Sequence, residues 1–127
     1  MAMSAVVSRL PRVTDAEGSP VDHAHLARYT MGNRPLELEV LNLFADQAPE
    51  YLAQLRVARD EKAWRDAAHT LKGSARAVGA FRVGDLAMRA EALSGSPDPV
   101  ARAQVIESLE AALEEARAYI AGLEGAV

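Results

Sequence analysis

Four long segments of the chain repeat apolar residues at steps of three and four, which is the spacing of amphipathic helices. The segments cover residues 36–59, 60–79, 81–94 and 98–123. No segment shows the two-residue alternation of a half-buried strand. The positions that we expect to be buried are Leu41, Phe44, Ala48, Leu52, Leu55, Trp64, Ala68, Leu71, Ala75, Val78, Val83, Leu86, Ala87, Ala90, Leu93, Val105, Leu109, Ala112, Ala116, Ile120 and Leu123.

Residues that begin or end helices separate the four segments. Asp60 and Asp98 are candidate N-caps, and Pro99 suits the first helical turn after Asp98. Pro49 falls inside the first segment, but the apolar spacing continues in phase beyond it. We therefore expect one kinked helix there. Short connections favour antiparallel neighbours, so the sequence predicts an all-α, up-down antiparallel four-helix bundle.

The chain before residue 36 is expected to add one short helix to this bundle. Asp22 could cap a helix that runs to about Thr30, with Leu26 and Tyr29 on its apolar side. Residues 1–20 lack periodicity and are interpreted as a flexible N-terminal leader. This division leaves residues 21–127 as one helical domain. The start methionine and the leader favour a free-standing protein.

Composition narrows the class of protein further. The formal net charge is −4, which argues against general nucleic-acid binding. Without cysteine, the chain has no disulfides, zinc–thiolate sites or thiol nucleophiles. No apolar run approaches the roughly 20 residues of a membrane span. The composition therefore predicts a soluble cytoplasmic domain. His23 and His25 should face different directions on the short helix, so we expect no metal site.

Residues 69–76, His-Thr-Leu-Lys-Gly-Ser-Ala-Arg, carry the most functional information. On a helix, His69, Lys72, Gly73 and Arg76 share one face, away from the apolar positions Leu71 and Ala75. A neutral imidazole is a nucleophile near pH 7, because its unperturbed pKa is about 6.5. The neighbouring cations could hold phosphoryl oxygens.

Arg65 and the glycine add to what this face of the helix offers. Arg65 lies one turn before His69 and adds another cation. Gly73 lowers helix propensity by about 1 kcal/mol relative to alanine, which a need for close docking beside His69 would explain. Taken singly, an exposed histidine, solvated cations or a glycine at a helix crossing would all be ordinary. Their conjunction on one face predicts a histidine that carries a phosphoryl group.

The run from His69 to Ser74, with Gly79 ten residues after the histidine, resembles the signature of histidine-containing phosphotransfer (HPt) domains. The resemblance covers about residues 21–123. It implies that His69 is the phosphoacceptor, that Lys72 supports the phosphorylated state and that Gly73 permits docking of a receiver domain. It also implies that Gly79 shapes the end of the helix, and that Gln47, on the preceding helix, could hydrogen-bond the imidazole.

The resemblance predicts a phosphorelay protein that moves a phosphoryl group between receiver-domain aspartates. Its partners would be response-regulator receiver domains or a hybrid histidine kinase, and the receiver would supply the acidic pocket and Mg²⁺. We expect no cofactor on this chain, and no ATP site, because the sequence has no G-x-x-x-x-G-K-[ST] loop. We therefore expect a phosphoryl carrier and not an enzyme. Four helices in one chain can close a bundle alone, so we also expect a monomer.

Three alternatives remain open at this point. The dimerisation bundle of a sensor histidine kinase commonly has an acidic residue directly after the histidine, where this chain has Thr70. A helical adaptor without phosphochemistry would bind partners by an apolar face. A hydrolase with His69 as its base is the most distant, since no nucleophile or acidic orienter shares the face of His69.

Overall fold

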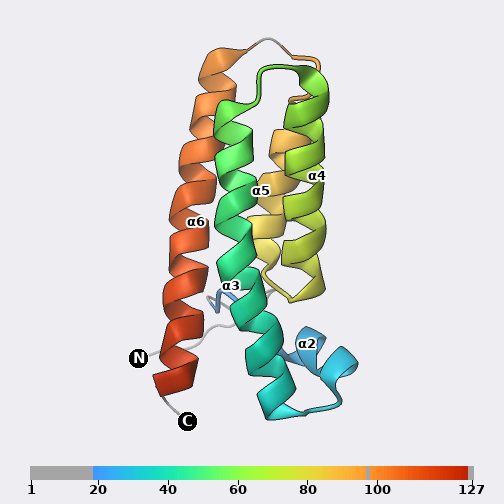
Figure 1. Cartoon of the computed structure of the whole chain (residues 1–127), viewed down its shortest axis with the longest axis vertical. Coiled ribbons are helices and arrows are strands. Elements are labelled where there is room, and N and C mark those ends of the chain that lie inside the picture. Colours follow the sequence, from blue (N-terminus) through green and yellow to red (C-terminus); the bar gives the residue numbers. More distant parts are fainter. Residues whose placement is uncertain (1–18, 97, 126–127) are drawn as a thin grey trace, which may run out of the picture.

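The computed structural model describes residues 19–96 and 98–125 (Figure 1). Within these residues the chain forms helices and no strands, so the predicted all-helical fold is confirmed there. The predicted leader lies outside the described residues except for its last two. The helices, labelled as in Figure 1, are α2 (His23–Thr30), α3 (Arg34–Val57), α4 (Glu61–Ala77), α5 (Phe81–Ala92) and α6 (Pro99–Gly125).

The four long helices lie side by side along the length of the molecule (Figure 1). Helix α4 contacts α3 and α5, and α6 contacts the same two helices from the other side. Helix α2 lies at one end, where it contacts α3. None of the helices in residues 19–96 and 98–125 has the length and apolarity that a membrane crossing requires.

The apolar positions predicted from the spacing form the core of this helical bundle. All of them are buried except Leu93 and Leu123, which are half-buried and pack against the core. Burial of one large aliphatic side chain stabilises a fold by about 1.5–3 kcal/mol. Alanines fill many of the remaining core positions, including Ala48, Ala68 and Ala87, which are 0% exposed. These small side chains let neighbouring helices approach closely.

One core prediction in the short helix is wrong. Tyr29 is 68% exposed, and its ring lies edge-on against His25 instead of packing inward. The buried face of α2 runs through Leu26 and Thr30, which are four residues apart and therefore share one side of the helix. Val21, just before the helix, extends this face, so Tyr29 lies beyond its edge.

Polar side chains cap the beginnings of α2, α3, α4 and α6, whereas α5 begins after Ala80 without a side-chain cap. Asp22, Asp60 and Asp98 each accept a hydrogen bond from the backbone N–H three residues later, as the sequence predicts. Asn33 caps α3 in the same way, through the N–H of Leu36. Helix α3 continues without a break through Pro49, which confirms one helix at that point.

Gly79 ends α4 and allows another part of the chain to pass closely. Its φ of +83° lies in the left-handed region, which favours glycine. A Cβ at this position would stand 2.7 Å from the carbonyl oxygen of Asp22. The N–H of Asp22 in turn donates to the Gly79 carbonyl at 2.9 Å. The glycine thus fastens the entry to α2 against the end of α4.

Candidate functional site

His69 lies in the middle of α4 with its side chain 68% exposed. Leu71 and Ala75, close to it on the same helix, are 0% exposed and pack into the core. The imidazole therefore projects from a helix whose opposite face is held by apolar contacts. A partner protein can reach the ring without any rearrangement of the fold.

A carboxylate from the neighbouring helix holds this imidazole. Glu91, near the end of α5, has its Oε2 3.0 Å from Nδ1 of His69. The other oxygen, Oε1, is 2.6 Å from Nζ of Lys72. Both Glu91 and Lys72 are largely covered, with side chains 24% and 21% exposed. One carboxylate thus joins the imidazole of His69 to the ammonium of Lys72.

These contacts fix the charge of Glu91. The hydrogen bond from Lys72 is the largest cause that lowers the pKa of Glu91, burial opposes it, and the hydrogen bond from His69 lowers it further. An ionised carboxylate can only accept hydrogen bonds. We therefore assign the neutral ring's proton to Nδ1, which leaves the lone pair on Nε2.

Gly73 leaves open space beside the histidine. A Cβ built at Gly73 would meet nothing within 4 Å, so this glycine is not a helix-crossing contact. Gly84 on α5 shows the contrast, because a Cβ there would stand 3.0 Å from Cγ of Arg76. The backbone of α4 is therefore bare at the surface one turn after His69.

The remaining predicted site residues form no hydrogen bond with the imidazole in the part of the chain that the structure describes. Arg76 crosses α5, where it donates to Sδ of Met88 at 3.3 Å and lies 3.9 Å from Oδ1 of Asp85. Arg65 on α4 and Gln47 on α3 are exposed. Within residues 19–96 and 98–125, neither forms a hydrogen bond with His69; Glu91 occupies Nδ1 instead.

Glu91 is the residue of this candidate site that the sequence did not single out. It belongs to another helix, and only the packing of α5 on α4 brings it to His69. A sequence signal existed, because Glu91 lies between the apolar positions Ala90 and Leu93 on the segment that follows the histidine helix. The hydrolase alternative was judged by the face of His69 alone, and Glu91 reaches the ring from α5; the His69–Glu91 pair contains no hydroxyl or thiol nucleophile.

The other histidines take no part in this site. A ring nitrogen of His23 is hydrogen-bonded to the Tyr119 hydroxyl, and the His25 ring packs edge-on against Phe81 at a centroid distance of 5.0 Å. Among the described residues, no cluster of histidine and carboxylate side chains is arranged to hold a metal ion.

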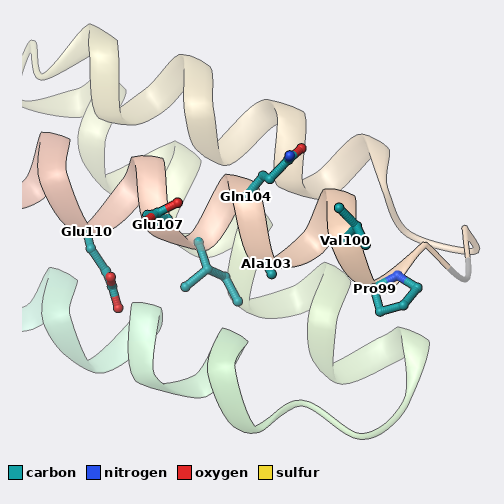
Figure 2. A pocket seen from close by; sticks show the side chains of 7 residues that line it. Pro99, Val100, Ala103, Gln104, Glu107 and Glu110 are labelled. Carbon is teal, nitrogen blue, oxygen red and sulfur yellow. The ribbon is translucent and has the colours of Figure 1, made fainter.

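A hollow on the surface of α6 is also separate from His69. Figure 2 shows the side chains that line it, all from that helix. Its lining has two carboxylates, Glu107 and Glu110, and otherwise uncharged side chains. Because it offers no basic or nucleophilic group, it does not suit phosphoryl chemistry, and His69 on α4 is the stronger candidate.

A comparison with known protein families identifies the family of this chain. The family model described as "Hpt domain" matches residues 39–119, from α3 to α6. No curated protein and no solved structure matched the chain. The matched region is more than half of the chain and includes His69, Lys72, Gly73 and Glu91. This chain therefore belongs to the Hpt domain family.

Proposed function

We propose that this chain shuttles a phosphoryl group between the aspartates of receiver domains and that His69 is the phosphoacceptor. Hpt domains act in phosphotransfer within phosphorelay signalling, as phosphoryl carriers and not as classical enzymes. The observation that carries the proposal is the exposed imidazole of His69, whose Nδ1 is held by Glu91. The arrangement leaves Nε2 as the reactive atom.

The transfer needs no general base on this chain. The lone pair of Nε2 attacks the phosphorus of an aspartyl phosphate on the receiver, and the bond from phosphorus to the carboxyl oxygen breaks. The aspartate leaves as a carboxylate with the bonding electron pair. The phosphorylated ring keeps its proton on Nδ1, where Glu91 stabilises the positive charge that the ring acquires. In the second transfer, the aspartate of another receiver attacks the phosphorus, and Nε2 departs with the bonding electron pair.

Lys72 supports the charge of the phosphoryl group in this scheme. Its ammonium is a point charge on a flexible four-carbon stem. The salt bridge between this ammonium and Glu91 keeps the charge next to the carboxylate that holds His69. We assign Arg76, Arg65 and Gln47 to contacts with the partner protein and not with the phosphoryl group. Gly73 provides the clearance that lets a receiver approach the ring.

The receiver supplies the rest of the reaction centre. Phosphoryl transfer depends mainly on positioning and charge neutralisation, so an acidic pocket with Mg²⁺ on the partner completes the site. The partners are response-regulator receiver domains, a hybrid histidine kinase, or both, met in the cytoplasm. The chain has no ATP site in this proposal. We also propose an up-down antiparallel four-helix bundle that acts as a monomer, supported by the core that α3–α6 enclose.

Receiver-driven labelling tests the proposal. The protein is mixed with a receiver phosphorylated on its aspartate with radioactive phosphate, and a second receiver is added afterwards. We expect acid-labile, base-stable label on the wild type, loss of that label to the second receiver, and no label from ATP alone. His69→Gln should take up none, whereas His23→Gln and His25→Gln should label normally. Label that persists in His69→Gln would overturn the assignment, and an intact biological output in that variant would favour the adaptor alternative.

A further inference from the structure

The carboxylate that holds His69 comes from a part of α5 that a helix alone fixes poorly. Glu91 is the next-to-last residue of α5. The last four carbonyl groups of a helix lack the N–H partner four residues on, and helix ends fray unless other groups bind them. Here the N–H groups of Leu93 and Ser94 bind the carbonyls of Ala90 and Glu91 in a closing turn, which is a local contact that joins α5 to no other helix. The position of Glu91, and with it the hydrogen bond to Nδ1 of His69, therefore depends on what holds this end of α5.

Side chains from two other helices bind the carbonyls on either side of Glu91. The indole Nε1 of Trp64, on α4, donates to the carbonyl of Ala90 at 2.6 Å. The guanidinium of Arg102, on α6, donates through Nη2 to the carbonyl of Leu93 at 2.9 Å. Glu91 thus lies between two side-chain hydrogen bonds that join the end of α5 to its neighbours.

Arg102 and Trp64 also contact each other and share a third partner. The guanidinium of Arg102 lies 4.5 Å from the centre of the Trp64 ring, within the range of a cation–π contact. Its Nη2 donates to Oε1 of Glu61 at 2.6 Å. The same Glu61 oxygen accepts the N–H of Gly95, just after α5, at 2.6 Å. Glu61, Trp64 and Arg102 form a single cluster around the end of α5, here called the α5 clamp.

We propose that the α5 clamp is a positioning device for the phosphotransfer site, with Trp64 and Arg102 as positioning residues that keep Glu91 on Nδ1 of His69. The inference rests on the proposed function of His69. Trp64 lies on the same helix as His69, five residues before it. Its bond to Ala90 therefore sets the spacing of α4 and α5 next to the histidine. Loosening the clamp releases Nδ1, and the ring proton then redistributes between the two nitrogens.

The burial of the cluster argues for a specific geometry. Trp64 is 3% exposed. A buried indole N–H needs a hydrogen-bond acceptor, and here the acceptor is the carbonyl of Ala90. The Arg102 side chain is 20% exposed, and its Nη2 donates to both Glu61 and Leu93. Burying polar groups costs free energy unless they are hydrogen-bonded, so the fold has to keep these bonds. Apolar residues could close this end of the bundle without bonding the carbonyls next to Glu91.

The direct test is ¹⁵N nuclear magnetic resonance of the His69 ring in the full chain, without phosphorylation and above the ordinary pKa of an imidazole. The wild type should give a pyrrole-type signal from Nδ1 and a pyridine-type signal from Nε2. Glu91→Gln provides the reference for a lost carboxylate. Trp64→Phe removes the indole donor but keeps an aromatic ring, and Arg102→Lys keeps the charge but loses the guanidinium that contacts both Leu93 and Glu61.

Two controls change side-chain contacts that involve neither Glu91 nor the α5 clamp. Tyr119→Phe removes the part-buried hydrogen bond between its hydroxyl and His23. Arg56→Lys weakens the exposed ion pair with Glu110, which joins α3 to α6. These controls measure what the loss of an ordinary tertiary hydrogen bond does to the His69 signals.

We expect Trp64→Phe and Arg102→Lys to shift the His69 signals toward those of Glu91→Gln, and both controls to leave them unchanged. Receiver-driven transfer should slow about threefold to tenfold in the two clamp variants, the effect of losing one positioned hydrogen bond. Unchanged His69 signals in both clamp variants would overturn the proposal, even if the variants were less stable. If Trp64→Phe does not fold, Arg102→Lys decides. The ¹⁵N signals are recorded without a partner protein, so they test the α5 clamp independently of phosphotransfer. If a phosphorylated receiver fails to phosphorylate the wild type, the proposed function of His69 is refuted, but the result on the α5 clamp still holds.

Discussion

At the scale of single residues, the site is organised by the contacts of Glu91. Its two oxygens hold His69 and Lys72, so the carboxylate orients the nucleophile and tethers the cation at once. The sequence could place His69, Lys72 and Gly73 on one face of a helix, because the helical repeat fixes that relation. It could not place Glu91, because the contact depends on how α5 is rotated against α4. Nor could it show that Arg76 is drawn across α5 to Asp85 and Met88.

Replacing Glu91 by glutamine should slow receiver-driven transfer about tenfold or more, because an amide no longer favours the proton on Nδ1 or the charge of the phosphorylated ring. The fold should persist, since the side chain lies at the edge of the bundle. Transfer rates measured at saturating receiver, beside circular dichroism spectra, check this. An unchanged rate would show that the contact in the resting protein has no role in the reaction.

Glu91 should also make the free energy of unfolding depend on pH. Because folding lowers the pKa of Glu91 below the ordinary 4.5, its contribution is fully present above pH 4.5 and is lost as the pH falls through the lower folded value. The difference in unfolding free energy between wild type and Glu91→Gln should therefore shrink on acidification below about pH 4.5. Denaturant titrations from pH 7 to pH 3 measure it. A difference that stays constant across this range would contradict the assigned ionisation.

Gly73 should show opposite effects on stability and function. Gly73→Ala should stabilise the protein by about 0.5–1 kcal/mol, because alanine favours a helix and its Cβ meets nothing. Gly73→Gln should fold normally but block transfer, because its bulk obstructs docking. Gly84→Ala is the control: its Cβ would crowd Arg76 and offset the gain. Thermal unfolding and transfer rates check each variant, and normal transfer by Gly73→Gln would rule out the docking role.

At the scale of the helices, local sequence signals predicted most of the fold. The caps at Asp22, Asp60 and Asp98 and the buried faces of the long helices follow from side-chain chemistry and helical spacing. The prediction failed for the short α2, where eight residues contain too few repeats to define a buried face and Tyr29 points outward. Contacts between helices, such as that of Trp64 with Ala90, have no local signal at all.

The junction of α4 with the start of α2 gives a test at this scale. Gly79→Ala should destabilise the protein by roughly 2 kcal/mol or more, because a positive φ and a close contact with the Asp22 carbonyl add up. Gly95→Ala is the matched control, since Gly95 has φ +81° but open space around its Cβ. Denaturant unfolding of both variants separates the two effects. Equal losses would mean that the contact with Asp22 contributes nothing.

At the scale of the whole molecule, the bundle encloses its own core and leaves His69 outside it. Helices α3–α6 enclose a continuous apolar core, and α2 covers one end. His69 stands on the outer face of α4, with its side chain 68% exposed. In the proposed function, the fold contributes position and charge, the partner supplies the acidic pocket and the metal ion, and the chemistry takes place only in the complex.

A core enclosed by one chain predicts stability that does not depend on association. The midpoint of thermal unfolding should stay constant over a hundredfold range of protein concentration, because no subunit contact is lost on unfolding. Sedimentation should give the mass of a single chain. A midpoint that rises with concentration, together with a dimer mass, would favour the dimerisation bundle of a sensor kinase.

The central claim is that Nε2 of His69 carries the phosphoryl group. The most direct test is to phosphorylate ¹⁵N-labelled protein with a phosphorylated receiver and to record ¹⁵N and ³¹P spectra that locate the phosphorus–nitrogen bond. The account predicts one phosphorylated histidine, His69, with phosphorus coupled to Nε2 and the proton retained on Nδ1 beside Glu91. Phosphorus on Nδ1, on His23 or His25, or on no histidine at all would contradict it.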